Sequence, residues 1–157
     1  MKSIHIYDLD GTIIDSSHRY KTIHNGVKLT IDLAHWLANV KHSRKDKLLP
    51  LAEQYKKMRA DPNVYTIWCT ARQTAQVTPF MDWFQDTLGL PNRFICRPDG
   101  NNESGAILKS KQLKSFLNLK QFQNVPIYFY EDNLTYLNAV CDNIGSIGIY
   151  VPSQQGH

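Results

Sequence analysis

Two carboxylates stand where a short apolar segment ends, in Asp8-Leu9-Asp10, and Gly11 and Thr12 follow them. Side chains alternate along an extended chain, so Asp8 and Asp10 are predicted to lie on the same side of it. Gly11 lets the backbone turn sharply and approach a ligand closely. Two carboxylates this close repel each other unless they share a proton or a cation. A hard divalent ion such as Mg²⁺ relieves the repulsion, and the pattern therefore indicates a metal-assisted carboxylate site.

The elements that must position these groups are strands and helices in alternation. The predicted strands are Ser3–Tyr7, Val64–Cys69, Arg93–Cys96, Pro126–Tyr130 and Ile147–Val151. The predicted helices run from Thr30 to about Val40, from Pro50 to Asp61, from Thr78 to Gly89, from Ser104 through Leu117 and from Asn133 to Gly145. This alternation predicts an α/β fold, a doubly wound, Rossmann-like parallel sheet of about five strands with helices on both faces and a minimal cap.

Further polar residues follow the later strands of the predicted sheet. Thr70 and Arg72 come after the second strand, and Glu131 and Asp132 come after the fourth. The carboxyl ends of parallel strands lie at one edge of a sheet, where open α/β sheets bind their ligands. We therefore expect these residues to converge on Asp8 and Asp10. Each of these residue types is common at the end of a strand, so the prediction depends on their joint occurrence in this order.

Length and composition fit one domain over residues 1–157, with residues 15–62 supplying a short cap region and the crossover helix. The 157 residues are 42% hydrophobic and 20% charged, with a net charge of +4. No segment has the pattern of a membrane span or a signal peptide. Three widely spaced cysteines favour free thiols in a reducing cytoplasm over a disulfide framework or a zinc site. No feature indicates an obligate protein partner.

These segments together resemble the four motifs of the haloacid dehalogenase (HAD) superfamily of phosphotransferases. The sequence is more similar still to one branch, the phosphatase domain of phage-type polynucleotide kinase/phosphatase and its stand-alone relatives, without a kinase portion. The segments that carry this resemblance are Ile14-Asp15-Ser16-Ser17-His18-Arg19, Thr70-Ala71-Arg72 and Arg97-Pro98-Asp99-Gly100. The chain departs from the branch at Glu131-Asp132-Asn133, where Asp-Asp-Arg is common, and at Gly105, where Asp is frequent.

The resemblance implies hydrolysis of a phosphorylated substrate through an aspartyl-phosphate. Asp8 would be the nucleophile, and Asp10 would first protonate the leaving oxygen and then activate water. Mg²⁺ would be held by the Asp8 carboxylate, the backbone carbonyl of Asp10 and Asp132, with Glu131 in or next to the coordination sphere.

The same resemblance implies residues that bind the substrate. Thr70 and Lys109 would contact the phosphoryl oxygens, and Arg72 would add a two-pronged guanidinium contact. In the branch the lysine follows the arginine at the position of Arg97 by twelve residues, which selects Lys109 over Lys111. The candidate substrate contacts are His18, Arg19 and Arg97.

Three functions remain open at the level of sequence. The favoured one is a Mg²⁺-dependent phosphatase for the 3′-phosphate ends of nucleic acid, whose backbone could follow the basic run Lys41–Lys47. The second is a phosphatase for mononucleotides or another small phosphoester, with the same catalytic residues. The third is a receiver-like signalling module with an aspartate phosphoacceptor. Receivers carry that aspartate on their third strand, whereas Asp8 follows the first.

Overall fold

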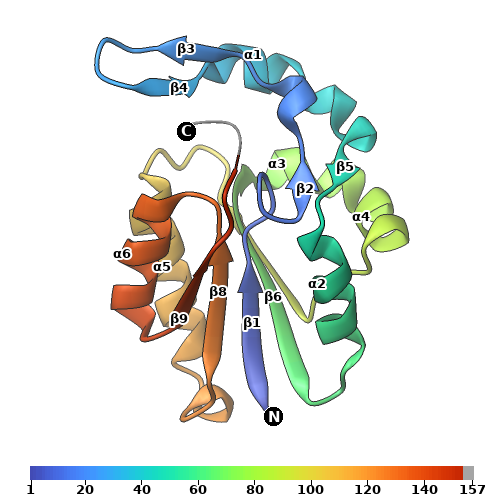
Figure 1. Ribbon diagram of the computed structural model, residues 1–157, viewed down its shortest axis with the longest axis vertical. Coiled ribbons are helices and arrows are strands. Elements are labelled where there is room, and N and C mark those ends of the chain that lie inside the picture. The colour runs from blue at the N-terminus through green and yellow to red at the C-terminus, as the bar shows by residue number, and fades with distance from the viewer. Residues whose placement is uncertain (154–157) are drawn as a thin grey trace.

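The central feature of the computed structural model, which describes residues 1–153, is a five-stranded sheet (Figure 1). Its strands are β1 (Ser3–Tyr7), β6 (Val64–Gln73), β7 (Arg93–Arg97), β8 (Ile127–Glu131) and β9 (Ile147–Tyr150). They lie in the order β7-β6-β1-β8-β9, and all neighbouring pairs are parallel. The predicted doubly wound α/β fold is confirmed.

The strand order reverses at β1, because the chain builds outward through β6 and β7 before it crosses back to β8 and β9. Ligands of open α/β sheets bind at such a switch point, at the carboxyl ends of the strands. The fold therefore places the ends of β1, β6 and β8 around one position.

Helices cover both faces of the sheet. One layer contains α2 (Leu51–Ala60), α3 (Thr74–Val77) and α4 (Met81–Thr87), and the other contains α5 (Gly105–Leu117) and α6 (Leu134–Ile144) (Figure 1). The alternation of side chains along β1 assigns its residues to the two layers. Ile4 and Ile6 pack in the core under α5 and α6, whereas Tyr7 and Leu9 pack in the core under α2 and α4.

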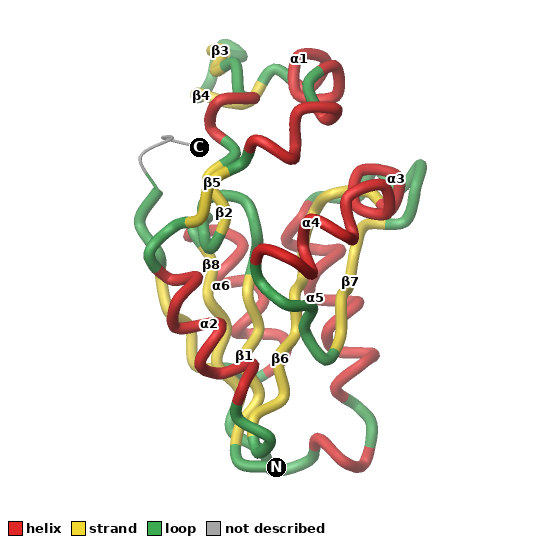
Figure 2. Tube along the Cα trace, turned by 90° about the vertical axis from the view of Figure 1, so that its right-hand side faces the viewer, coloured by secondary structure: helices red, strands yellow, loops and turns green. Residues whose placement is uncertain are grey.

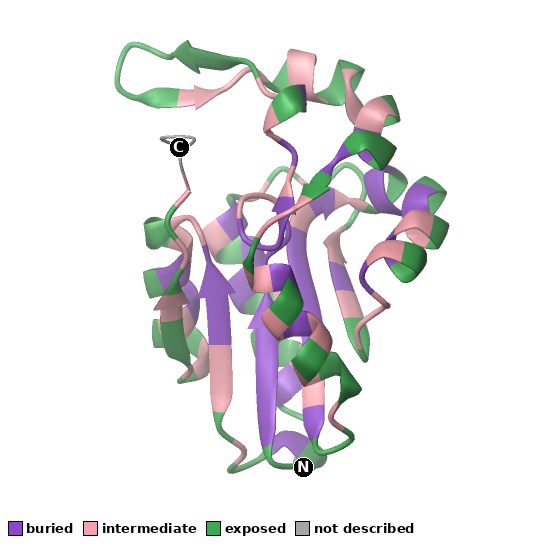
Figure 3. Cartoon of the chain, turned by 45° about the vertical axis from the view of Figure 1, so that its right-hand side comes forward, coloured by how far each residue is buried: buried purple, intermediate pink, exposed green. Residues whose placement is uncertain are grey.

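An insert between β1 and α2 stands over the carboxyl ends of the strands, as Figures 1 and 2 show. Its elements are β2 (Ile14–Asp15), η1 (Ser17–Arg19), β3 (Thr22–His24), β4 (Leu29–Ile31), α1 (Leu33–Ala38), η2 (Val40–Lys45) and β5 (Lys47–Leu48). The pairs β2–β5 and β3–β4 are antiparallel. Figure 3 shows the contrast between the buried central strands and the largely exposed β3–β4 hairpin.

Two helices differ from their predicted bounds. The first is shorter than expected, because Thr30 pairs with Ile23 in the β3–β4 hairpin and Asp32 caps α1 instead, accepting a hydrogen bond from the His35 N–H. The third begins earlier and is broken into α3, the 3₁₀ turn η3 (Thr78–Phe80) and α4. A further 3₁₀ turn, η4 (Lys120–Phe122), precedes β8. Within residues 1–153 no helix has the length and apolarity needed to cross a membrane.

Candidate active site

A buried lysine joins two carboxylates at the switch point of the sheet. Lys109 reaches from α5, and its Nζ lies 2.8 Å from Asp8 Oδ1 and 2.7 Å from Glu131 Oε2. Both carboxylates lie at the ends of strands, since Asp8 directly follows β1 and Glu131 is the last residue of β8. The Lys109 side chain is 1% exposed. The lysine selected by resemblance thus lies among the acidic groups, whereas Lys111 pairs with Glu103 at the surface.

Asp8, Glu131 and Asp132 form an acidic cluster in which one oxygen of each lies within 4.8 Å of the others. Thr12 Oγ1 donates to Asp8 Oδ2 at 3.2 Å and lies 3.4 Å from Asp132 Oδ1. Glu131 accepts from Lys109 with one oxygen and from the Asn133 N–H with the other. Asp8 and Asp132 therefore have the oxygens best placed to bind a cation.

The charges of this cluster do not balance, since three carboxylates face one ammonium group. Burial and the nearby Glu131 raise the pKa of Asp8 to about 7. Burial and the nearby Asp8 raise the pKa of Asp132 to about 10. Burial alone would lower the pKa of Lys109, but Asp8 and Glu131 raise it well above its usual value. A divalent cation fits these hard oxygen donors, because it would compensate the excess negative charge that burial leaves unscreened.

Gly11 leaves the space in which Asp132 approaches the loop after β1. Its φ is +79°, a conformation that glycine adopts without strain. A Cβ at this position would lie 2.1 Å from Asp132 Oδ2. A side chain at position 11 would thus displace the Asp132 carboxylate from the acidic cluster.

Asp10 is held by an arginine. Arg72 Nε donates to Asp10 Oδ2 at 2.9 Å and Arg72 Nη2 donates to Asp10 Oδ1 at 2.6 Å, while Ser16 Oγ donates to Oδ1 at 2.6 Å. Burial alone would raise the pKa of Asp10, but Arg72 lowers it below its usual value. The two guanidinium nitrogens of Arg72 that we expected to bind a phosphoryl group are hydrogen-bonded to Asp10 in this structure. Nη1 of Arg72 is the remaining nitrogen, and it is buried without a hydrogen-bond partner among the described residues.

Arg19 is fully buried beside this pair and is held by Asp46, which the sequence interpretation missed. Arg19 Nε and Nη2 donate to the two oxygens of Asp46 at 2.9 and 2.8 Å. Arg72 Nη2 also reaches Asp46, at 3.1 Å, and His18 Nε2 lies 2.7 Å from it. The available signal was that Asp46 is the one acidic residue in the basic run 41–47.

Thr70 and Arg97 occupy different environments. Thr70 is buried in the extended end of β6, and its Oγ1 accepts a hydrogen bond from the Arg72 N–H. The register that pairs Tyr7 with Trp68 brings Thr70 level with the loop after β1. The Arg97 guanidinium donates to three backbone carbonyls, those of Ala71, Asn101 and Glu103. These bonds fasten the loop between β7 and α5, and Arg97 as a substrate contact stays a prediction.

The departure at Gly105 has a packing explanation. A Cβ on Gly105 would lie 2.6 Å from the ring of Tyr136, so this ring takes the space in which the similar branch frequently has an aspartate. Lys109 Nζ lies 5.6 Å from the centre of the same ring. Lys109 is thus bordered by an aromatic face in place of a third carboxylate.

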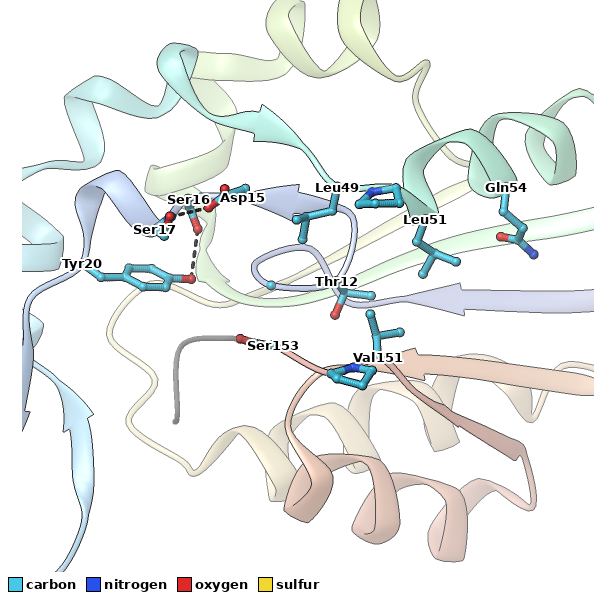
Figure 4. Close-up of a pocket in the computed structure, with 13 residues that line it drawn as sticks. Thr12, Asp15, Ser16, Ser17, Tyr20, Leu49, Leu51, Gln54, Val151 and Ser153 are labelled. Atoms are coloured by element: carbon cyan, nitrogen blue, oxygen red, sulfur yellow. Dashed lines mark hydrogen bonds between the residues drawn. The ribbon is translucent and has the colours of Figure 1, made fainter.

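A pocket of about 690 Å³ adjoins these groups, between the insert, the start of α2 and the segment after β9 (Figure 4). Thr12 and Ser16 belong to its wall, and they hydrogen-bond Asp8 and Asp10 respectively. Most of the remaining wall is apolar or aromatic and includes Tyr20, Leu49, Pro50, Leu51, Val151 and Pro152. Mostly apolar walls with a few polar groups are typical of a small-molecule site.

The family model of the bacteriophage T5 5′-deoxynucleotidase matches residues 1–80, which is about half of the chain. The chain belongs to this family. The matched region contains Asp8, Asp10, Thr70, Arg72 and the insert, whereas Lys109, Glu131 and Asp132 lie beyond it. A comparison with curated proteins gives no match.

Solved structures share the fold of this nucleotidase-family chain. A chain of the Pnkp1/Rnl/Hen1 RNA repair complex is 18% identical with a TM-score of 0.68 over 97% of this chain and 42% of that one. The HAD domain of the effector Lem4 from Legionella pneumophila is 14% identical with a TM-score of 0.60, covering 100% and 88%. A HAD hydrolase of subfamily IA from Geobacter sulfurreducens is 11% identical with a TM-score of 0.54, covering 95% and 86%.

This chain spans less than half the length of the Pnkp1/Rnl/Hen1 chain that it resembles. The low identities make these structures evidence for the fold. The chain therefore has a fold shared with HAD hydrolases and belongs to the T5 5′-deoxynucleotidase family.

Proposed function

We propose that the protein is a Mg²⁺-dependent nucleotidase that hydrolyses deoxynucleoside monophosphates through an aspartyl-phosphate on Asp8. The main observation in support is the acidic cluster at the end of β1, where Asp8 lies beside Asp132 and accepts a hydrogen bond from Lys109. The T5 5′-deoxynucleotidase family, to which the chain belongs, supports the choice of substrate. Asp8, Asp132 and the backbone carbonyl of Asp10 would hold the ion, with Glu131 fixing Lys109 beside them.

The bound ion would supply positive charge at the phosphoryl group and at Asp8. In the first step an Asp8 oxygen attacks phosphorus, the bond between phosphorus and the leaving oxygen breaks, and Asp10 gives that oxygen a proton. In the second step water attacks phosphorus, Asp10 takes a proton from the water, and Asp8 leaves as a carboxylate. Lys109 and Thr70 would bind the phosphoryl oxygens throughout.

Asp10 can serve as the acid only if its contact with Arg72 changes when substrate binds. Arg72 keeps Asp10 ionised in the substrate-free protein, because it lowers the pKa of that carboxyl. A phosphoryl group that draws Arg72 partly away would let the pKa of Asp10 rise again. Substitution of Asp10 by Asn should therefore impair an alkyl phosphate more than an activated aryl phosphate, whose leaving group needs no proton. Equal losses for the two substrates would remove Asp10 from the acid role.

The pocket favours a mononucleotide over a polymer. Its volume of about 690 Å³ and its mixture of Tyr20 with aliphatic walls suit one nucleoside beside the reacting groups. A second candidate, the 3′-phosphate end of a nucleic acid, is favoured by the exposed lysines of η2 and β5, including Lys45 and Lys47. The fold shared with a chain of an RNA repair complex is compatible with it.

One comparison of substrates separates these candidates. We expect the wild-type protein with Mg²⁺ to hydrolyse deoxynucleoside 5′-monophosphates with a higher kcat/KM than a 3′-phosphorylated oligonucleotide. Replacing Lys45 and Lys47 with Ala should leave mononucleotide turnover unchanged. A preference for the oligonucleotide, with a salt dependence of kcat/KM that these two replacements flatten, would establish the polynucleotide function instead. Activity on neither substrate, with an aryl phosphate still cleaved, would point to another small phosphoester.

A further inference from the structure

Asp46 is the acidic centre of a buried group of charges that spans the insert and the sheet. It accepts two hydrogen bonds from Arg19 and one from Arg72, and it lies against His18. The Asp46 side chain is 0% exposed, and those of Arg19 and Arg72 are 1% and 2% exposed. None of these three groups can therefore rely on water to screen its charge.

The formal charges of this group balance without any ligand. Arg19 and Arg72 carry two positive charges, and Asp10 and Asp46 carry two negative ones. Arg72 is shared between the two carboxylates, and Arg19 Nη2 also lies 3.9 Å from Asp10 Oδ1. Trp36 of α1 covers Arg19, with the guanidinium carbon 4.1 Å from the ring centre. The insert thus supplies both the second carboxylate and an aromatic cover for the arginines.

Two buried arginines without Asp46 would form a strong phosphate trap. Asp10 alone would leave one positive charge on the two arginines uncompensated, and charge-assisted bonds from guanidinium to phosphate are among the stronger polar contacts in proteins. The unpartnered Nη1 of Arg72 shows that this side chain has a donor to spare. A hydrolase gains nothing from holding its phosphate product, because uniform tight binding lowers KM without raising kcat.

We propose that Asp46 is a positioning residue that neutralises Arg19 and Arg72, so that they orient a phosphoryl group without retaining the phosphate product. The proposal rests on the proposed function, since it needs a phosphoryl group at this site. The proposal predicts that substituting Asp46 changes phosphate affinity in the direction opposite to that expected for a purely structural residue. Loss of its charge should tighten phosphate binding, whereas loss of a mere scaffold would loosen it.

The test compares Asp46→Asn with wild type, using inorganic phosphate as the probe. Asp46→Asn should lower the inhibition constant of phosphate by about tenfold, the scale of one charge-assisted hydrogen bond, and should lower both KM and kcat for an aryl phosphate. Asp46→Glu keeps the charge, so its inhibition constant for phosphate should stay within about threefold of the wild-type value. The matched control is Asp82→Asn, which removes the acid of the exposed Arg44–Asp82 pair and should change nothing.

A second measurement covers the case in which Asp46→Asn folds poorly, as breaking a buried ion pair often causes. Thermal melting with and without phosphate should show a larger stabilisation of Asp46→Asn than of wild type, because phosphate replaces the missing negative charge. Equal or weaker stabilisation, or a weaker inhibition by phosphate, overturns the proposal. The melting comparison does not depend on turnover. It therefore tests the role of Asp46 even if the wild-type protein hydrolyses no nucleotide. Absence of nucleotide hydrolysis would contradict the proposed function alone.

Discussion

Two charged regions meet at the end of β1, and they are built in opposite ways. The acidic cluster, Asp8, Glu131 and Asp132 with Lys109, comes from strand ends and α5 and carries more negative charge than its lysine neutralises. The arginine group formed by Arg19, Arg72, Asp10 and Asp46 is neutral by itself and depends on the insert for Arg19 and Asp46. If the proposed function is correct, the acidic cluster at the sheet would bind a cation, whereas the arginine group at the insert would bind and release an anion.

The largest effect is expected where the acidic cluster would do covalent chemistry. Asp8→Asn should lower kcat/KM for an aryl phosphate with Mg²⁺ by about a thousandfold or more, since loss of a nucleophile leaves only the binding contributions. Asp86→Asn, at an exposed aspartate of α4, is the control and should behave as wild type. Retained activity in Asp8→Asn would rule out an aspartyl-phosphate on this residue and would leave the acidic cluster as a metal site only.

The next largest effect is expected for Lys109, whose ammonium group is the protein's own positive charge in the acidic cluster. Lys109→Ala should cost about a hundredfold in kcat/KM, because it removes a fixed donor beside the phosphoryl position and leaves Asp8 and Glu131 unpaired. Lys111→Ala should change the rate by less than about twofold, since its pair with Glu103 is at the surface. Lys109 and Lys111 are two residues apart on α5, so their side chains point in directions about 200° apart around the helix axis. A larger loss at position 111 would contradict the assignment.

Most of the sheet could be predicted from sequence because its strands are short segments of mainly apolar residues. The segment Ser3–Tyr7 is fully buried, and its predicted bounds match β1. The strand predicted to end at Cys69 continues to Gln73, because the pairing with β7 shifts in register after Cys69 and resumes at Arg97. Such a shift depends on a partner strand and leaves no local pattern.

The insert was less predictable, because its elements are short and depend on distant partners. The β3–β4 hairpin was missed, since each of its strands has three residues, too few for a recognisable alternation of polar and apolar side chains. Asp46 was missed for a related reason. Its neighbours are basic and suggest a solvated surface, yet its own partners are Arg19 and Arg72, 27 and 26 residues away in the chain. Ion pairs of this kind are visible only after folding.

A smaller effect should follow from crowding the acidic cluster without changing its charge. Gly11→Ala should raise the Mg²⁺ concentration for half-maximal activity by about tenfold, because the new Cβ displaces Asp132, one of the proposed ligands. Gly100→Ala is a matched control. Gly100 also has a φ of +79°, but a Cβ there meets nothing within 4 Å. Equal effects of the two substitutions would mean that backbone strain, and not the contact with Asp132, weakens metal binding.

The smallest effect tests whether the acidic cluster, unlike the arginine group, is incomplete without an ion. The raised pKa values of Asp8, about 7, and Asp132, about 10, mean that the metal-free folded state holds protons that the unfolded state has lost above pH 4. Stability of the metal-free protein should therefore fall as the pH rises from about 4 through 7 and on toward 10. Mg²⁺ replaces these protons, so its stabilising effect should increase over the same range. We expect Mg²⁺ to raise Tm by about 2–4 °C at pH 7, by less at pH 5 and by more at pH 9. Melting curves at the three pH values would measure this, with Asp132→Asn as the variant in which the response should disappear. A Mg²⁺ response that is largest at pH 5, or that survives in Asp132→Asn, would place the cation elsewhere.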